Sequence, residues 1–88
     1  MTDGADDPLP ARLREAVGLA LRGDWQAAHL IVQEHDDDST AAWIHAVCHR
    51  MEGDLGNALY WYRRCRRRLR EDVPAESELR EIEAHLSR

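Results

Sequence analysis

Three side chains that can bind a metal or carry a proton stand close together in the middle of the chain. His45, His49 and Glu52 are separated by four and then three residues, and these spacings place side chains on one face of an α-helix. Imidazole nitrogens and carboxylate oxygens are ligands for zinc and iron. His29 lies in a preceding helical segment and could approach the same face. These four residues form the candidate metal site.

The same histidines have a second interpretation, in which they are hydrogen-bonded within an interface between two helices. Histidines four residues apart also occur on helices that bind no metal, and the sequence has no second strong pair of ligands. His49 and Glu52 could act as an acid–base pair, but no nucleophile stands beside them. No glycine-rich phosphate loop or nucleophile motif is present. The sequence therefore favours a protein without catalytic activity and predicts no cofactor.

Six arginines crowd between residues 63 and 70. We expect them near the C-terminal end of a helix, where positive charge is favoured by the helix dipole, and paired with glutamates of the last helix. Binding to phosphate or to an acidic protein is the alternative. The net charge of −5 argues against general binding of nucleic acid.

The elements that position these side chains are short helices joined by tight turns. Gly23-Asp24 and Gly53-Asp54 each combine a glycine that can end a helix in the left-handed conformation with an aspartate that can cap the next one. No segment shows sustained strand alternation. Because short links make sequential helices pack as antiparallel neighbours, the sequence predicts an all-α fold of two antiparallel helix hairpins plus a C-terminal capping helix.

Capping residues and prolines predict the helix boundaries. Residues 1–7 are expected to form a disordered acidic tail, and residues 8–88 a single helical domain. The two cysteines, Cys48 and Cys65, are expected to be reduced and buried. The expected boundary residues are Asp7 as the first cap with Pro8 in the first turn, Arg22 near the end of the first helix, Ser39 or Thr40 as the third cap, Leu69 in the fourth helix, and Val73-Pro74 before the last helix.

The two hairpins resemble tetratricopeptide repeats, and the second also resembles the related Sel1-type repeat. In that family a small residue follows the turn glycine by five positions and a larger one follows four positions later; here these are Ala28 and Val32, then Ala58 and Tyr62. The resemblance spans about residues 10–70. It implies that these residues face inward and that His29 lies beside an inward position. The repeat spacing of thirty is shorter than the usual length of about 34.

Aromatic side chains of the fourth helix indicate a surface for another protein. Tyr60, Trp61 and Tyr62 are consecutive and spread over about 200° of a helix, so they cannot all face one core. With Tyr62 inside by the repeat pattern, Tyr60 or Trp61 is left near the surface, where such residues are enriched at binding hot spots. Packing against another segment is the alternative. The expected interaction surface is a groove that comprises Trp43, His45, His49, Tyr60, Trp61, Arg63 and Arg67.

Two repeats are fewer than the three that such arrays generally need, so one end would expose an apolar helix face. A homodimer that buries this face is the simplest remedy.

The sequence has no secretory signal and no run of about 18 apolar residues, which favours the cytoplasm and no membrane partner. The predicted function is a protein–protein interaction or self-association module. The alternative is a small metal- or ligand-binding protein, open to catalysis, that uses His29, His45, His49 and Glu52.

Overall fold

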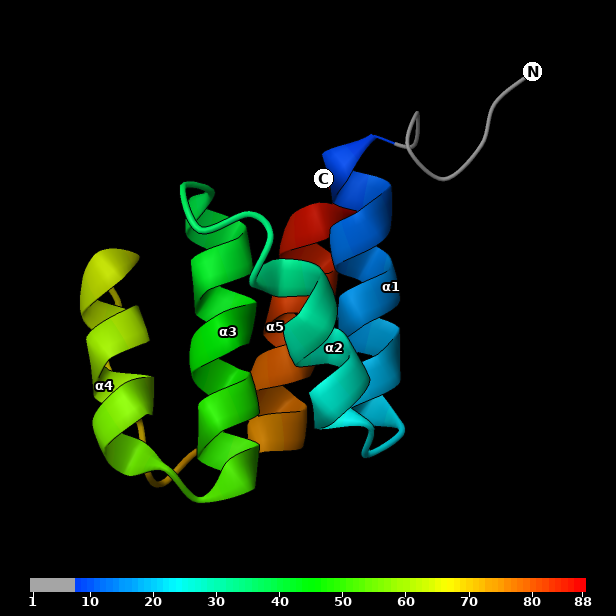
Figure 1. The fold of residues 1–88 in the computed structure, drawn as a ribbon. Helices are drawn as coiled ribbons and strands as arrows, with labels where there is room; N and C mark the ends of the chain where they lie inside the picture. Colours follow the sequence, from blue (N-terminus) through cyan, green and yellow to red (C-terminus); the bar gives the residue numbers. More distant parts are fainter. Residues whose placement is uncertain (1–7) are drawn as a thin grey trace.

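The computed structural model describes residues 8–88, which form five helices and no strand. The predicted all-α fold is confirmed: α1 pairs with α2 and α3 pairs with α4 as two antiparallel hairpins, and α5 follows (Figure 1). The expected tail and the expected cap Asp7 lie outside the described residues. The helices are α1 (Leu9–Leu21), α2 (Trp25–Val32), α3 (Ser39–Glu52), α4 (Leu55–Arg64) and α5 (Ala75–Leu86).

The two Gly-Asp turns adopt the predicted conformation. Gly23 has φ 89° and Gly53 has φ 92°, both left-handed. Asp24 accepts a hydrogen bond from the backbone N–H of Ala27 at 3.1 Å, and Asp54 accepts one from Asn57 at 3.2 Å. Each turn therefore ends one helix and caps the next within two residues, which leaves the hairpins little freedom in how they fold back.

Three predicted boundaries were wrong: the start of α1, the cap of α3 and the end of α4. The first helix begins at Leu9 with Pro8 as its N-cap, and α3 is capped by Asp38 instead of Ser39 or Thr40. The Asp38 carboxylate accepts from the N–H of Ala41 at 2.8 Å, and an aspartate side chain reaches this position as readily as a hydroxyl does.

The fourth helix ends at Arg64, five residues before Leu69. Arg66 has φ 61°, and the backbone N–H of Arg67 bonds to the carbonyl of Tyr62 at 2.9 Å. This is the same Schellman motif that ends α1 and α3 at glycines, here with an arginine at the left-handed position. Most of the arginine run therefore lies in the non-helical segment between α4 and α5.

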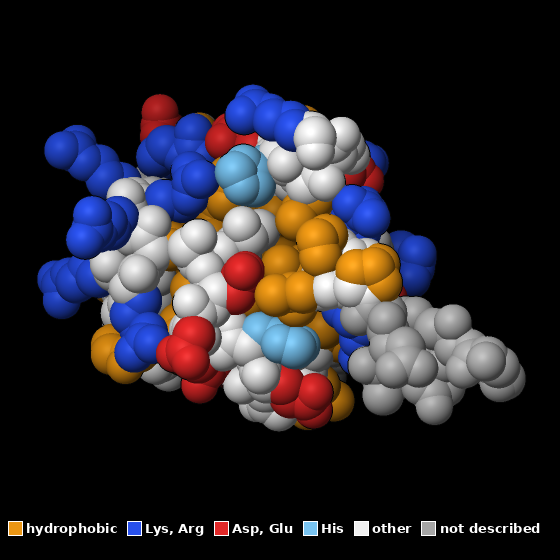
Figure 2. Space-filling view, turned by 90° about the horizontal axis from the view of Figure 1, so that it is seen from above, with side chains coloured by type: hydrophobic (Ala, Val, Ile, Leu, Met, Phe, Trp, Pro, Cys, Tyr) orange, Lys and Arg blue, Asp and Glu red, His pale blue; other side chains and the backbone are white. Residues whose placement is uncertain are grey.

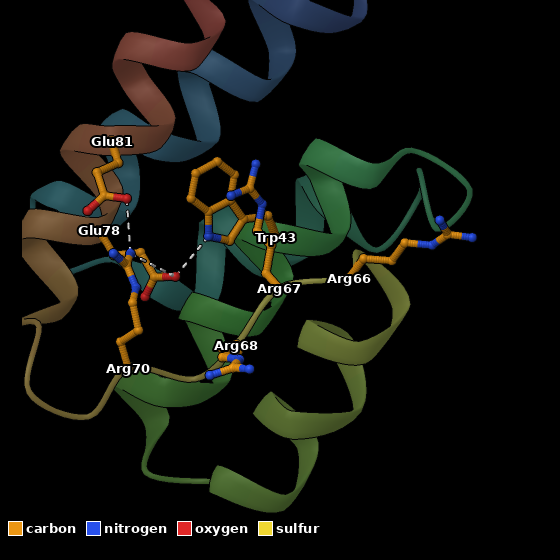
Figure 3. Close-up of a pocket in the computed structure, with 7 residues that line it drawn as sticks. All are labelled: Trp43, Arg66, Arg67, Arg68, Arg70, Glu78 and Glu81. Atoms are coloured by element: carbon orange, nitrogen blue, oxygen red, sulfur yellow. Dashed lines mark hydrogen bonds and ion pairs between the residues drawn. The ribbon is translucent and has the colours of Figure 1, made fainter.

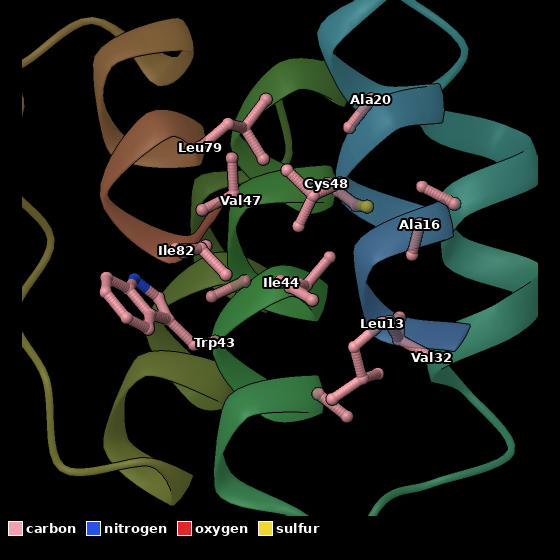
Figure 4. Close-up of a cluster of buried hydrophobic side chains, with 14 of the residues drawn as sticks. Leu13, Ala16, Ala20, Val32, Trp43, Ile44, Val47, Cys48, Leu79 and Ile82 are labelled. Atoms are coloured by element: carbon pink, nitrogen blue, oxygen red, sulfur yellow. The ribbon is translucent and has the colours of Figure 1, made fainter. Parts of the chain in front are cut away.

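The third helix is the centre of the fold. It contacts all four other helices, and its residues 41–48 are buried without interruption. In Figure 1, α2 and α5 cover opposite sides of the layer that α1 and α3 form. The last helix therefore does not stack beyond α4 but folds back onto α1 and α3. Figure 4 shows Ile44, Val47 and Cys48 of α3 meeting Leu79 and Ile82 of α5 and the small residues of α1.

A buried carboxylate joins three of the helices. Glu78 of α5 is 1% exposed. Its Oε2 accepts from Trp43 Nε1 at 2.8 Å, and its Oε1 accepts from the Tyr62 hydroxyl at 2.7 Å and from Arg50 Nη1 at 2.8 Å. Arg50 also donates to the carbonyl of Val73, so the segment that enters α5 is tied to α3 as well. The charge is paired and its oxygens are hydrogen-bonded, which is the condition for burying a carboxylate.

We predict that Glu78→Leu lowers the free energy of unfolding by about 3 kcal/mol, because Arg50 then loses its partner in a mostly buried position. Glu81→Leu, one turn away on the exposed side of α5, is the matched control and should change the value by less than about 0.5 kcal/mol. Urea unfolding followed by circular dichroism measures both. Equal effects of the two substitutions would contradict the importance of the buried network.

Burial and the hydrogen bond to Glu78 raise the pKa of Tyr62 well above its ordinary value. Above pH of about 10 the unfolded chain therefore loses a phenolic proton that the folded chain retains, and stability must fall as pH rises, by up to about 1.4 kcal/mol per pH unit. In a Tyr60→Phe variant, whose single tyrosine is Tyr62, tyrosinate absorbance should appear only as helicity is lost. Tyrosinate formation in a fully helical protein near pH 10 would refute this prediction.

Candidate metal centre

Helices α2 and α3 bring three histidines together on the inner side of their interface. His29 comes from α2, and His45 and His49 come from successive turns of α3. One ligand nitrogen from each lies within 4.8 Å of the other two. The histidines predicted to share a face therefore do so, including His29 from the separate helix. Glu52 lies at the edge of this His cluster (His29, His45 and His49) and is exposed.

The rings of the His cluster are packed in direct contact. The ring centres of His29 and His45 are 4.5 Å apart with an edge-to-face arrangement, and those of His45 and His49 are 5.1 Å apart and nearly parallel. Trp61 of α4 stacks on His45 with ring centres 3.8 Å apart and an interplanar angle of 12°. The cluster is thus closed on one side by an indole, and His29 and His49 remain partly exposed.

The ring nitrogens of the His cluster differ in whether they have a hydrogen-bond partner. His45 is 4% exposed, and its Nδ1 is buried without a hydrogen-bond partner. Leaving such a group unpaired costs about 1–3 kcal/mol. His49, in contrast, bonds through Nδ1 to Glu52 Oε1 at 2.9 Å. The cluster therefore contains one ring nitrogen that lacks the partner its burial requires.

The environment keeps two of the imidazoles, those of His45 and His29, neutral. Burial, together with the neighbouring His29 and His49, lowers the pKa of His45 to about 3. Burial and His49 also lower the pKa of His29. At neutral pH these rings carry lone pairs instead of a second proton, and this is the protonation state that a metal ligand requires.

Cys48 lies on α3 beside His49 in sequence but does not belong to the His cluster. Its side chain is buried in the core between α1 and α5 (Figure 4), and burial raises the pKa of its thiol to about 12. A thiol that stays protonated is not a metal ligand. Both cysteines are free, but the prediction that both are buried is correct only for Cys48, because Cys65 is half-buried.

The predicted interaction groove is not one continuous surface. Trp43 is 3% exposed and lies on the side of α3 that faces Glu78, under the guanidinium of Arg67 at 3.4 Å from its ring centre. His45, two residues later and about 200° around the helix, points to the opposite side and is covered by Trp61. The expectation that these residues line a single exposed groove is therefore wrong, because residues two apart on a helix face different ways.

The remaining residues of the predicted groove divide between the two sides. Tyr60 is 50% exposed and meets Trp61 edge to face at 5.2 Å. Arg64 lies over the rings of both, so these aromatics stay beside the His cluster. Arg63 and Arg67 belong instead to the far side, where α4 ends and the arginine run begins.

The sequence reasoning missed Glu78 and the stacking of Trp61 on His45. Glu78 lies four residues before the buried Ile82 and thus on the same face of α5, but a glutamate is ordinarily expected at the surface unless it is paired. No local signal marks the Trp61 contact, because it depends on how α4 rotates against α3.

Comparisons of the chain with protein-family models, with curated proteins and with solved structures found no match. The resemblance to tetratricopeptide and Sel1-type repeats stays a prediction. Within residues 8–88, no helix is long and apolar enough to span a bilayer.

We predict that in metal-free buffer His45→Leu raises the free energy of unfolding by about 1 kcal/mol, because it removes the unpaired buried nitrogen and keeps a similar volume. His35→Leu, in the link between α2 and α3, serves as the control for replacing a histidine elsewhere. Thermal and urea unfolding measure the change. A loss of stability in His45→Leu would show that the imidazole has a structural role that its contacts do not reveal.

Proposed function

We propose that this protein binds a transition-metal ion, with Zn²⁺ as the first candidate, through one nitrogen each of His29, His45 and His49. The observation that carries the proposal is the convergence of three ligand nitrogens within 4.8 Å, in a cluster where the buried Nδ1 of His45 has no partner. Imidazole nitrogens are among the ligands that transition-metal ions prefer in proteins.

Metal binding requires the rings to turn, because those of His45 and His49 are nearly parallel and an imidazole lone pair lies in the plane of its ring. Zinc–nitrogen bonds of about 2.0–2.1 Å in a tetrahedron place the nitrogens about 3.3 Å apart, and rotations of the partly exposed rings of His29 and His49 can supply this contraction. Three protein nitrogens leave a fourth position for water. Cu²⁺ and Ni²⁺ also bind imidazole, so the competing ions are part of the test.

Glu52 supports the proposed site from outside the three nitrogens. When His49 donates its Nδ1–H to Glu52 Oε1 at 2.9 Å, its Nε2 carries the lone pair and becomes the ligand atom. A carboxylate in this position orients the ring and makes the metal-bound nitrogen more basic. The combination of His and carboxylate that the sequence places three residues apart thus has a definite role at the metal.

We predict one Zn²⁺ per chain by mass spectrometry and titration calorimetry of the metal-free protein. His29→Ala and His49→Ala should each weaken zinc binding by more than the roughly tenfold loss expected for Glu52→Gln, with helicity retained. Zinc at 100 times its dissociation constant should raise the free energy of unfolding by about 2.7 kcal/mol.

His35→Ala and His85→Ala are the matched controls, because both remove a histidine outside the His cluster and should leave zinc affinity unchanged. Equal losses in the control variants would show nonspecific binding by surface histidines. Absence of a bound ion in titrations with Zn²⁺, Cu²⁺ and Ni²⁺ would refute the proposed function.

A further inference from the structure

The outer side of α4 is a helix face without a helical neighbour. Among the helices of residues 8–88, α4 packs along its length only against α3, and it reaches α5 through the hydrogen bond of Tyr62 to Glu78. Leu55 and Leu59, one turn apart on its outer side, are 44% and 39% exposed. Beside them lies a hollow of about 610 Å³, with the buried Tyr62 contributing to its wall. Its other lining residues are Leu59, Arg63, Arg67, Arg68, Leu69 and Glu71.

The rim of this hollow carries a net positive charge, because three arginines and one glutamate, Glu71, line it. Within the described part of the chain, Arg63, Arg67 and Arg68 form no ion pair, whereas Arg70 pairs with Glu81 at 2.9 Å. The expectation that glutamates of α5 neutralise the run therefore holds for Arg70 alone. In Figure 2, basic side chains gather at the α4 side of the molecule.

The backbone that places these arginines is strained. Arg66 occupies the left-handed region at φ 61°, which costs a residue with a side chain about 1 kcal/mol or more. This turn ends α4 early and brings Arg67, Arg68 and Leu69 beside the outer face of the helix.

The arginines diverge instead of surrounding one point. Figure 3 shows Arg66 pointing away from Trp43, whereas Arg67 lies along the indole and Arg70 turns to Glu81. Divergent guanidinium groups cannot all contact one small anion. They suit a ligand that presents several carboxylates along a surface.

We infer that the arginine-rimmed hollow docks an acidic amphipathic helix of a partner protein. An apolar side chain of that helix enters the hollow between Leu59 and Leu69, and its carboxylates pair with Arg63, Arg67 and Arg68. The opposite charges make binding selective for an acidic partner, and contact with Leu59 and Leu69 buries the apolar side chain of that partner. This inference is independent of metal binding, because it uses none of the His cluster.

Two other occupants fit the surface less well. Single-stranded nucleic acid is bound through exposed aromatic rings on which bases can stack, and the only aromatic residue of the hollow, Tyr62, is buried. A second copy placed symmetrically on this face would bring the two arginine rims together. The homodimer expected from the sequence stays a prediction, and its interface would have to lie elsewhere than on two arginine-rimmed hollows placed face to face.

The test uses fluorescence anisotropy with three labelled probes at physiological ionic strength, in the presence of a chelator so that metal has no part. The probes are a helical peptide with leucines at i, i+4 and i+7 and glutamates elsewhere, the same peptide with lysine for glutamate, and a single-stranded RNA of equal charge. We expect saturable binding of the acidic peptide, at least about tenfold tighter than either other probe.

The double variant Arg63→Glu/Arg68→Glu should weaken this binding by at least about tenfold, and so should Leu59→Ser, with circular dichroism unchanged. Both variants leave the Arg67–Trp43 contact in place. Arg80→Glu, which reverses an exposed charge on α5, is the matched control and should bind within about twofold of the parent.

Several results would overturn the inference. Equal affinity for the acidic and basic peptides, no saturation by the acidic peptide, or tighter binding of RNA would each do so. A dimer seen by light scattering that Leu59→Ser dissociates would assign the face to a second copy. Zinc binding by an unchanged His cluster would stand in any of these cases, so the two proposals fail separately.

Discussion

The arrangement of α3, α4 and α5 depends on the buried carboxylate of Glu78. One side chain accepts hydrogen bonds from Trp43, Arg50 and Tyr62, so the rotation of α3 and α4 about their axes is set by the same two oxygens. A carboxylate at 1% exposure tolerates few other arrangements, because any slip of a helix leaves a charge or a donor unpaired in the core. Apolar contacts alone would permit several registers of short, alanine-rich helices.

Both candidate surfaces follow from this constraint. With Trp43 held against Glu78, His45 two residues later must face the opposite side of α3, where α2 presents His29. With Tyr62 held by its hydroxyl, the preceding Trp61 turns toward His45, and Leu59 and Arg63 turn outward on α4. The His cluster and the arginine-rimmed hollow therefore lie on different sides of the molecule for one geometric reason, the spacing of residues around two fixed helices.

The sequence predicts the fold better than the sites. Gly23-Asp24 and Gly53-Asp54 combine two local signals at each turn, and local signals suffice for hairpins of short helices. The end of α4 was mispredicted because an arginine occupies the left-handed position where glycine is the usual marker. The histidine grouping was predictable from spacing, but the unpaired nitrogen of His45 and the burial of Glu78 arise from contacts between helices, which residue type and periodicity do not specify.

The contrast between two buried polar residues is the strongest argument that the histidines serve a ligand. Glu78 and His45 are about equally buried, yet the carboxylate has three donors and the imidazole Nδ1 has none. The same small core therefore hydrogen-bonds the Glu78 carboxylate fully and leaves the His45 Nδ1 without a partner. An apolar residue at position 45 would pack against Trp61 without that cost. An ion that accepts the lone pairs of all three rings would make the cluster complete.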